Sequence, residues 1–345
     1  MSRVRDIANI LSGGSSAIAT DAEIPSYVAG KNAIVNGGMD IWQRGSSFAS
    51  TGGAYIADRW YGAASGSGST TYSRQSPGST LPQFQYCLRS QRTNGSTETT
   101  SQQIGHTLET AESLRFAGQT ITVSFYARAG ANYSPTGGIL YFILNCGTGT
   151  DQRVLGGGFT GVSTLIFQAP VLTTSWQRIS YSVAIPSNVT QIGFYTQANV
   201  TGTAGAADWH EITGYQLEVG SVTTSFSRSG GTIEGELSAC QRYYQRKNSA
   251  GNGTIFAMGQ CQNTTNAYYM CPTPVQLRVT PSVATSGVVG WTASTGNAGG
   301  TIAVFQMSPD AVSLQLTGGN SLVAGNASAM AGSTSSAYLE LSAEL

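Results

Sequence analysis

Few side chains in this sequence can carry out acid–base or nucleophilic chemistry. The two histidines, His106 and His210, stand at no metal-ligand spacing such as H-E-x-x-H. The cysteines are odd in number and form no C-x-x-C pair, so they predict free, mostly buried thiols rather than a zinc site or a full disulfide set. They are Cys87, Cys146, Cys240, Cys261 and Cys271.

Carboxylates are the remaining candidates for catalysis. Glycoside hydrolysis requires two carboxylates that face one sugar ring. The acids that could do so are few, and their spacing favours no particular pair. We therefore expect a protein without enzymatic activity. The candidates considered are Asp58, Asp151, Asp208, Glu211 and Glu218.

Aromatic side chains offer a different chemistry. An exposed ring can stack on the face of a sugar while Asn, Gln and Asp hold the sugar hydroxyls. The chain has 16 tyrosines and five tryptophans, although a ring at alternating strand positions more often belongs to a core. We expect glycan or receptor contacts from Trp209, Tyr268, Tyr269, Trp291 and Tyr338, and Tyr133 is a further candidate.

The charge balance limits the classes of partner. Only 10% of the 345 residues are charged, and 17 basic residues balance 17 acidic ones. A neutral chain does not favour a phosphate-binding surface for nucleic acid or a polybasic membrane patch. The start lacks the features of a secretory signal, and no apolar run approaches the roughly 20 residues of a membrane span. We expect synthesis in a cytoplasm, no membrane insertion, and neutral partners such as glycans or proteins.

The first 31 residues predict a helix followed by a linker. Val4, Ile7 and Leu11 lie on one helical face, Ser2 can cap the helix, and glycines follow at 13 and 14. Such a short helix is marginal in water by itself, so its apolar stripe should pack against sister subunits or a larger assembly. The alternative is a frayed terminus.

Residues 32–230 predict an antiparallel sandwich. Runs rich in β-branched and aromatic residues alternate with clusters of Gly, Ser, Thr and Asn, and a single short helical stretch interrupts them at 107–118. This pattern favours an all-β protein with a jelly-roll sandwich rather than an α/β fold. The predicted strands lie at 83–92, 119–129, 138–146, 175–185 and 191–199.

Residues 231–345 predict a connecting helix and a smaller C-terminal β domain. Ile233, Leu237, Cys240 and Tyr244 share a helical face, with Thr232 as the cap. Further strands follow at 253–262, 267–279, 301–308, 311–318 and 337–345, with prolines at corners or edges.

Four sequence blocks resemble a module of bacteriophage tail fibres and related virion structural proteins. They are NAIVNGGMDIWQRGSSF at 32–48, YIADRWYG at 55–62, ITGYQLEVGSVTTSFSR at 212–228 and LSACQRYYQR at 237–246. Jelly-roll sandwiches of this group are similar to carbohydrate-binding modules. The segment at 3–23 looks like a virion-anchoring segment, and the terminal YLELSAEL looks like the end of such fibres.

The resemblance implies a trimeric tail fibre that binds a host surface glycan and is located in the virion. Val4, Ile7 and Leu11 would then anchor the homotrimer to other tail proteins. Three alternatives remain: a capsid decoration or cement protein, a tailspike that depolymerises polysaccharide, and a monomeric cellular carbohydrate-binding module. The expected tip is the C-terminal domain, although the residues leave open whether the tip or the sandwich makes the decisive contact.

Two local interactions are also expected, and a metal site is an alternative to ordinary surface acids, which is the favoured interpretation. Residues 36–38, Asn-Gly-Gly, predict a tight turn, because a positive φ costs little energy at glycine. Asp58 and Arg59 predict a local ion pair. The resemblance further implies a structural calcium ion, for which carboxylates near the closing strand are suitable ligands. The residues considered are Asp40, Asp208 and Glu218, and no other cofactor is expected.

Overall fold

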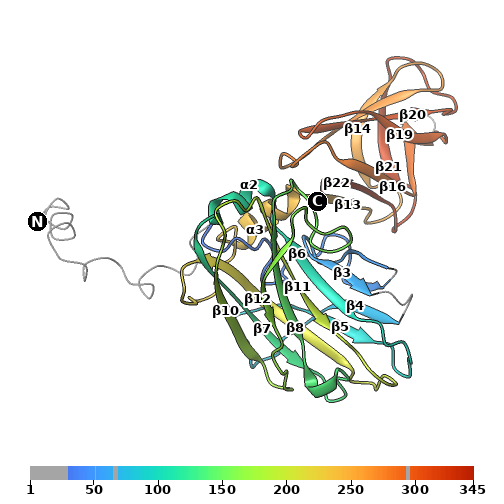
Figure 1. The fold of residues 1–345 in the computed structure, drawn as a ribbon. Helices are drawn as coiled ribbons and strands as arrows, with labels where there is room; N and C mark the ends of the chain where they lie inside the picture. The colour runs from blue at the N-terminus through green and yellow to red at the C-terminus, as the bar shows by residue number, and fades with distance from the viewer. Residues whose placement is uncertain (1–29, 51, 65–68, 293–295) are drawn as a thin grey trace, which may run out of the picture.

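The computed structural model describes residues 30–50, 52–64, 69–292 and 296–345. The chain folds into a β-sandwich, and a second β domain lies beside one end of it (Figure 1). The predicted N-terminal helix, including Val4, Ile7 and Leu11, lies outside the described residues.

Two six-stranded antiparallel sheets form the sandwich. Sheet A contains, in spatial order, β1 (Ser47–Ala49), β4 (Thr70–Gln75), β5 (Cys87–Arg92), β12 (Trp209–Val219), β7 (Thr120–Ala129) and β10 (Gln177–Ala184). Sheet B contains β2 (Ala54–Tyr55), β3 (Tyr61–Ala64), β6 (Gln102–Thr107), β11 (Gln191–Ala198), β8 (Tyr141–Gly147) and β9 (Ser163–Gln168). The helical stretch predicted at 107–118 consists of α2 (Thr110–Ser113) and the 3₁₀ turn Leu114–Phe116.

The eight strands β5 to β12 have the connections of a jelly roll. Strands β5, β12, β7 and β10 lie side by side in sheet A, and β6, β11, β8 and β9 lie side by side in sheet B. The chain therefore crosses repeatedly between the sheets, as in a double Greek key. The predicted fold class is confirmed.

Alternating side chains fill the space between the two sheets. The buried rings of Phe125, Tyr215 and Trp60 form its centre, with ring centroids 4.6 Å apart for Phe125 and Tyr215 and 4.8 Å apart for Trp60 and Tyr215. Trp60 thus belongs to the core of the sandwich.

The loop at Asn36 connects the core residue Trp60 to the backbone at Ile41 and Asp58. The side chain of Asn36 donates to the carbonyls of Ile41 (2.8 Å) and Asp58 (3.0 Å), and its backbone carbonyl accepts from the Trp60 indole (3.0 Å). The predicted turn differs in detail, because the positive φ angles belong to Asn36 (59°) and Met39 (57°). Gly37 is required for a different reason, since a Cβ there would lie 2.2 Å from the Tyr215 carbonyl oxygen.

Helix α3 (Ile233–Gln241) follows the sandwich. Its cap is confirmed, because the Thr232 side chain accepts from the Gly235 backbone N–H at 3.1 Å. The predicted shared face is wrong in part, because Tyr244 begins β13 instead of extending the helix. Of the other three residues Cys240 is buried, whereas Ile233 and Leu237 are exposed. The helix instead turns Glu236 inward, where its carboxylate accepts from the backbone N–H groups of Asn36 and Gly230.

The C-terminal domain has a core of its own. Its three-stranded sheet contains β13 (Tyr244–Asn248), β22 (Tyr338–Ser342) and β16 (Ser282–Ser286). Its seven-stranded sheet contains β18 (Gly296–Asn297), β17 (Val288–Thr292), β21 (Ala327–Gly332), β14 (Ile255–Cys261), β15 (Ala267–Pro272), β20 (Ala311–Thr317) and β19 (Thr301–Met307). All five cysteines of the chain are free and buried, as predicted.

A buried ion-pair network joins the C-terminal domain to the sandwich. Arg44 and Arg59 of the sandwich both pair with the carboxylate of Glu344, and the Arg59 guanidinium lies 3.7 Å from the centre of the Tyr243 ring. The expected pair between Asp58 and Arg59 is therefore wrong, because Asp58 faces Arg44 at 3.5 Å. Burial raises the pKa of the Asp58 carboxyl to about 6.

The buried His210 makes acid stability a test of the core. Neither of its ring nitrogens has a hydrogen-bond partner within the described part of the chain, and burial lowers its pKa from 6.5 to about 4. Between these values the unfolded chain takes up a proton that the folded protein does not, so stability falls as the pH falls.

We expect wild-type protein to lose roughly 3 kcal/mol more than His210→Leu when the pH is lowered from 7 to 4. Urea unfolding across this range measures the difference. The pKa of His106 is also lowered by burial, and this residue is present in both proteins, so it serves as the internal control. Equal pH dependence in the two proteins would contradict the prediction.

Candidate functional site

Charged and aromatic side chains gather on the outer face of sheet A. On β12, Trp209 and Glu211 alternate with the core residues His210 and Ile212, so they point away from the sandwich interior. In the strand register Glu211 lies opposite Arg89 of β5 on one side and Arg128 of β7 on the other. Together with Trp176, which precedes β10, these residues form the arginine–tryptophan cluster.

Both oxygens of the Glu211 carboxylate are held by arginines. One oxygen accepts from Arg89 at 2.6 and 2.9 Å, and the other accepts from Arg128 at 2.7 Å. Glu211 itself is 0% exposed, whereas the side chains of Arg89 and Arg128 are 23% and 21% exposed. The carboxylate therefore fixes the two arginines, whose remaining N–H groups can donate to a ligand.

The two tryptophans flank these arginines. The Arg89 guanidinium lies 4.2 Å from the centre of the Trp209 ring, and the Arg128 guanidinium lies 4.7 Å from that of Trp176. The Trp176 indole donates to the Pro77 carbonyl at 3.0 Å, which fixes its orientation. Both rings are half-buried. The cluster thus presents rigid, partly exposed rings beside oriented hydrogen-bond donors.

A cavity of about 430 Å³ lies on the same face of sheet A. Arg178 of β10 is directly opposite Tyr126 of β7, and Tyr126 precedes Arg128 by two residues, so cavity and cluster are neighbours. We call this cavity the Arg178 pocket. It is lined by Gln83, Tyr126, Arg178, Ser225, Phe226 and Arg228.

The aromatic residues predicted to contact a glycan occupy several places. Trp209 lies in the cluster, whereas Trp291, 40% exposed, lies on β17 of the other domain. The prediction of an exposed Tyr269 is wrong, because the ring is 1% exposed in the C-terminal core and its hydroxyl bonds to Ser328. The others are half-buried: Tyr268 packs on Phe305, Tyr338 lies beneath the Arg246 guanidinium, and Tyr133 lies against His210.

Sequence reasoning missed Arg89, Arg128 and Trp176. Each lies at the outward phase of a correctly predicted strand or just before it. An arginine at an outward position next to aromatic residues was the available signal. Their convergence on Glu211 depends on strand register, and the predicted strands did not specify that register.

The acids considered for calcium binding have other partners. Asp40 pairs with Arg228 at 2.8 Å, Asp208 pairs with Arg92 at 2.8 Å, and Glu218 accepts from Thr224 at 2.6 Å. In the ranges that the structure describes, no three His, Cys, Asp or Glu side chains gather in a way that could hold a metal ion.

Arg92 occupies a cage of oxygen atoms next to Asp208. Its guanidinium is 1% exposed and donates to four backbone carbonyls, to Ser134 and to the Asp208 carboxylate. The carbonyls belong to Ser96 (3.1 Å), Glu98 (2.6 Å), Thr201 (3.1 Å) and Gly202 (2.9 Å). One internal cation thus ties together three loops at this end of the sandwich, those between β5 and β6, β7 and β8, and β11 and β12.

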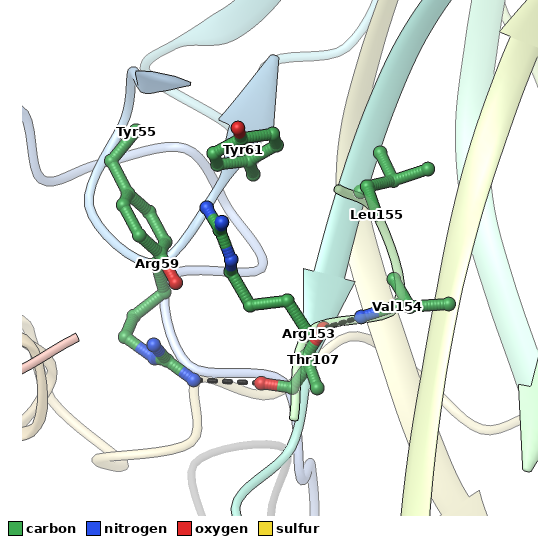
Figure 2. A pocket seen from close by; sticks show the side chains of 8 residues that line it. Tyr55, Arg59, Tyr61, Thr107, Arg153, Val154 and Leu155 are labelled. Carbon is green, nitrogen blue, oxygen red and sulfur yellow. Dashed lines mark hydrogen bonds between the residues drawn. The ribbon is translucent and has the colours of Figure 1, made fainter. Parts of the chain in front are cut away.

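Another cavity, much smaller, lies in the sandwich next to its junction with the C-terminal domain (Figure 2). Arg59 donates to the Thr107 carbonyl at 2.7 Å along the edge of the cavity. Tyr55 donates to the carbonyl of Leu345 at 3.1 Å. Its volume is about 10 Å³, the space of a single water molecule. This cavity is lined by sandwich residues and is too small for a sugar.

No protein-family model and no curated protein matches the chain. Similar solved structures include the enzymatically active domain of bacteriophage CBA120 tailspike protein 4, with 9% identity, a TM-score of 0.37, and coverage of 55% of this chain and 21% of that one. TmCBM61 in complex with β-1,4-galactotriose has 14% identity, a TM-score of 0.33 and coverage of 55% and 99%. The CBM22-1 xylan-binding domain from Paenibacillus barcinonensis has 13% identity, a TM-score of 0.32 and coverage of 56% and 98%. Such values assign no function, and the fold class rests on the strand order.

Replacing Arg92 tests its role as an internal cation. Arg92→Met leaves the Asp208 carboxylate buried without a counter-charge, so we expect a loss of about 3–5 kcal/mol in the free energy of unfolding. The double variant Arg92→Met, Asp208→Asn should recover part of this loss. Urea denaturation measures both variants, and a loss below about 1 kcal/mol in the single variant would exclude a strong buried pair.

Proposed function

We propose that this protein is a non-enzymatic, trimeric phage tail fibre that binds a glycan on the host surface. The observation that carries the proposal is the arginine–tryptophan cluster on the outer face of sheet A. The sequence blocks at 32–246 support the assignment to a tail fibre. In this proposal the sandwich makes the decisive contact.

The chemistry of the cluster is suited to sugars. Carbohydrate rings present C–H faces that stack on aromatic side chains and hydroxyls that accept from N–H donors. Trp176 and Trp209 supply the rings, and Arg89 and Arg128 supply donors that Glu211 already orients. Little side-chain entropy is then lost on binding, because the donors and rings are fixed beforehand.

The positions of the carboxylates support binding without hydrolysis. A glycosidase needs one carboxylic acid that donates a proton and one free carboxylate that faces the sugar. Both oxygens of Glu211 accept from arginines, and Asp151 and Asp208 each pair with an arginine at 2.7–2.8 Å. Incubation with host polysaccharide should therefore leave its chain length unchanged.

The seven-stranded sheet of the C-terminal domain supports self-association. Its strands contain no Asp, Glu, Lys or Arg. Trp291, Met258 and Met270 follow one another across its outer face, interrupted only by Ala329, and both methionines are 56% exposed. An uncharged face with exposed Met and Trp has the composition of an interface core and does not repel its own copy.

Residues 1–12 would attach the trimer to the virion. No helix within the described ranges is long and apolar enough to span a membrane.

A capsid decoration protein is the second candidate function, because the same apolar face could bind another virion protein. Imaging purified virions distinguishes the two: copies in multiples of three at the tail support the fibre, and copies across the capsid lattice support the decoration protein.

Alanine variants decide which domain binds the receptor. Trp176→Ala and Trp209→Ala each remove a stacking ring, so we expect each to weaken glycan binding by on the order of 10-fold or more. Tyr338→Ala is the matched control on the C-terminal domain, because Tyr338 lies on β22, outside the seven-stranded sheet, and it should bind normally. Binding to purified host polysaccharide, measured by biolayer interferometry, gives the result. Loss of binding in Tyr338→Ala alone would move the site to the C-terminal domain.

A lysine on the apolar face tests the oligomer. Met258→Lys and Met270→Lys place charges that would repel their copies across the interface, so the mass from light scattering should fall from trimer towards monomer. Val162→Lys, at a 56% exposed apolar residue of the sandwich, is the control and should remain trimeric. A trimer that survives both methionine substitutions would exclude this face as the interface.

A further inference from the structure

The Arg178 pocket contains a positive charge without a partner. Arg178 is exposed and donates to the Ser124 hydroxyl at 3.3 Å and to the Thr224 carbonyl. Within the described part of the chain no carboxylate lies within ion-pair distance of it, in contrast to Arg89 and Arg128 of the neighbouring cluster. Its guanidinium is therefore held in place and remains available to an anion.

A second arginine lines the same cavity with donors to spare. Arg228 uses its Nε to bind Asp40 at 2.8 Å, and its side chain is 30% exposed. Its two terminal nitrogens have no hydrogen-bond partner among the described residues, so they can donate to a ligand in the cavity. Two guanidinium groups thus line one cavity. Among the described residues the Asp40 carboxylate is the one that pairs with either of them, and it binds Arg228.

The rest of the cavity suits a sugar ring. Tyr126 and Phe226 both pack against Phe84, at centroid distances of 5.5 and 4.8 Å, so their rings form a fixed apolar wall. Gln83 adds an exposed amide that can bind hydroxyls. A volume of about 430 Å³ lies within the usual range for small-molecule pockets.

We propose that the Arg178 pocket binds a carboxylate-bearing sugar residue, as one subsite of a glycan that continues over the arginine–tryptophan cluster. The inference rests on the proposed glycan-binding function and adds the ligand's chemical class, an acidic polysaccharide. Arg178 and Arg228 hold the sugar carboxylate through charge-assisted hydrogen bonds. Tyr126 and Phe226 contact the ring, and the neighbouring Trp176 and Trp209 contact adjoining residues of the chain.

Carboxyl reduction of the glycan provides the test. A panel of purified acidic bacterial surface polysaccharides is assayed before and after reduction of its carboxylates to primary alcohols, with binding measured by biolayer interferometry. We expect wild-type protein to bind the native form about 10- to 100-fold more tightly than the reduced form. Raising the salt concentration should narrow this ratio, because the pocket is open to solvent.

The variant Arg178→Gln removes the arginine of the pocket that has no carboxylate partner and leaves Arg228 in place. We expect it to lose most of the preference for native over reduced polysaccharide and to keep the wild-type melting temperature. Arg153→Gln is the matched control, because Arg153 also lacks a carboxylate partner in the described structure but lies against Tyr61, at 4.5 Å, away from sheet A. The control should keep the full preference for the native form.

The outcomes separate the two proposals. Equal binding of native and reduced polysaccharide by wild-type protein would overturn the acidic subsite and leave the glycan-binding function intact. An Arg178→Gln variant that keeps the full preference for the native form would overturn the subsite in the same way. Binding to no member of the panel, in either form, would overturn the proposed function and the subsite together.

Discussion

The buried side chain of Asn36 is the interaction on which the arrangement of the whole chain depends. The Asn36 side-chain amide donates to the backbone carbonyls of Ile41 and Asp58. The backbone carbonyl of Asn36 accepts from the Trp60 indole, and its backbone N–H donates to Glu236 of α3. Every one of these polar groups is inside the protein, where an unpaired donor or acceptor costs about 1–3 kcal/mol. Loop conformations that leave any of these groups unpaired are therefore disfavoured.

The same loop explains why four separate sequence blocks have their particular residues. The first block carries Asn36, the second supplies Asp58 and Trp60, and the third lays the Tyr215 carbonyl against Gly37. The fourth block places Tyr243 beneath Arg59 and Tyr244 beneath Arg44. Most residues that carry the resemblance to phage fibres therefore build the connection between sandwich, α3 and C-terminal domain. The arginine–tryptophan cluster lies on other residues, and only the end of the third block, at Ser225, Phe226 and Arg228, reaches the Arg178 pocket. A resemblance in these blocks is informative about architecture and much less so about the ligand.

Local patterns predicted much of this structure, and long-range pairing limited the rest. Alternation located five of the eight jelly-roll strands, namely β5, β7, β8, β10 and β11. Thr232 was correctly identified as a cap because capping depends only on near neighbours. Tyr268 and Tyr269 show the limit, since the phase of the strand decides which of two adjacent rings is buried. Asp58 and Arg59 are neighbours in sequence but face different partners, and Arg59 binds Glu344 near the far end of the chain. Similarly, Glu211 was considered as a catalytic acid, and only the register of three strands identifies it as the anchor of two arginines.

The internal guanidinium of Arg92 makes the shape of the sandwich loops independent of dissolved metal ions. Many extracellular proteins hold neighbouring loops together with a metal ion taken from the medium, and they loosen when that ion is diluted or chelated. Here the positive charge at the centre of the oxygen cage is part of the polypeptide itself. It is present from the moment of synthesis and cannot be washed out. The loops at this end of the sandwich can keep one geometry in mineral-poor water and in salty media alike.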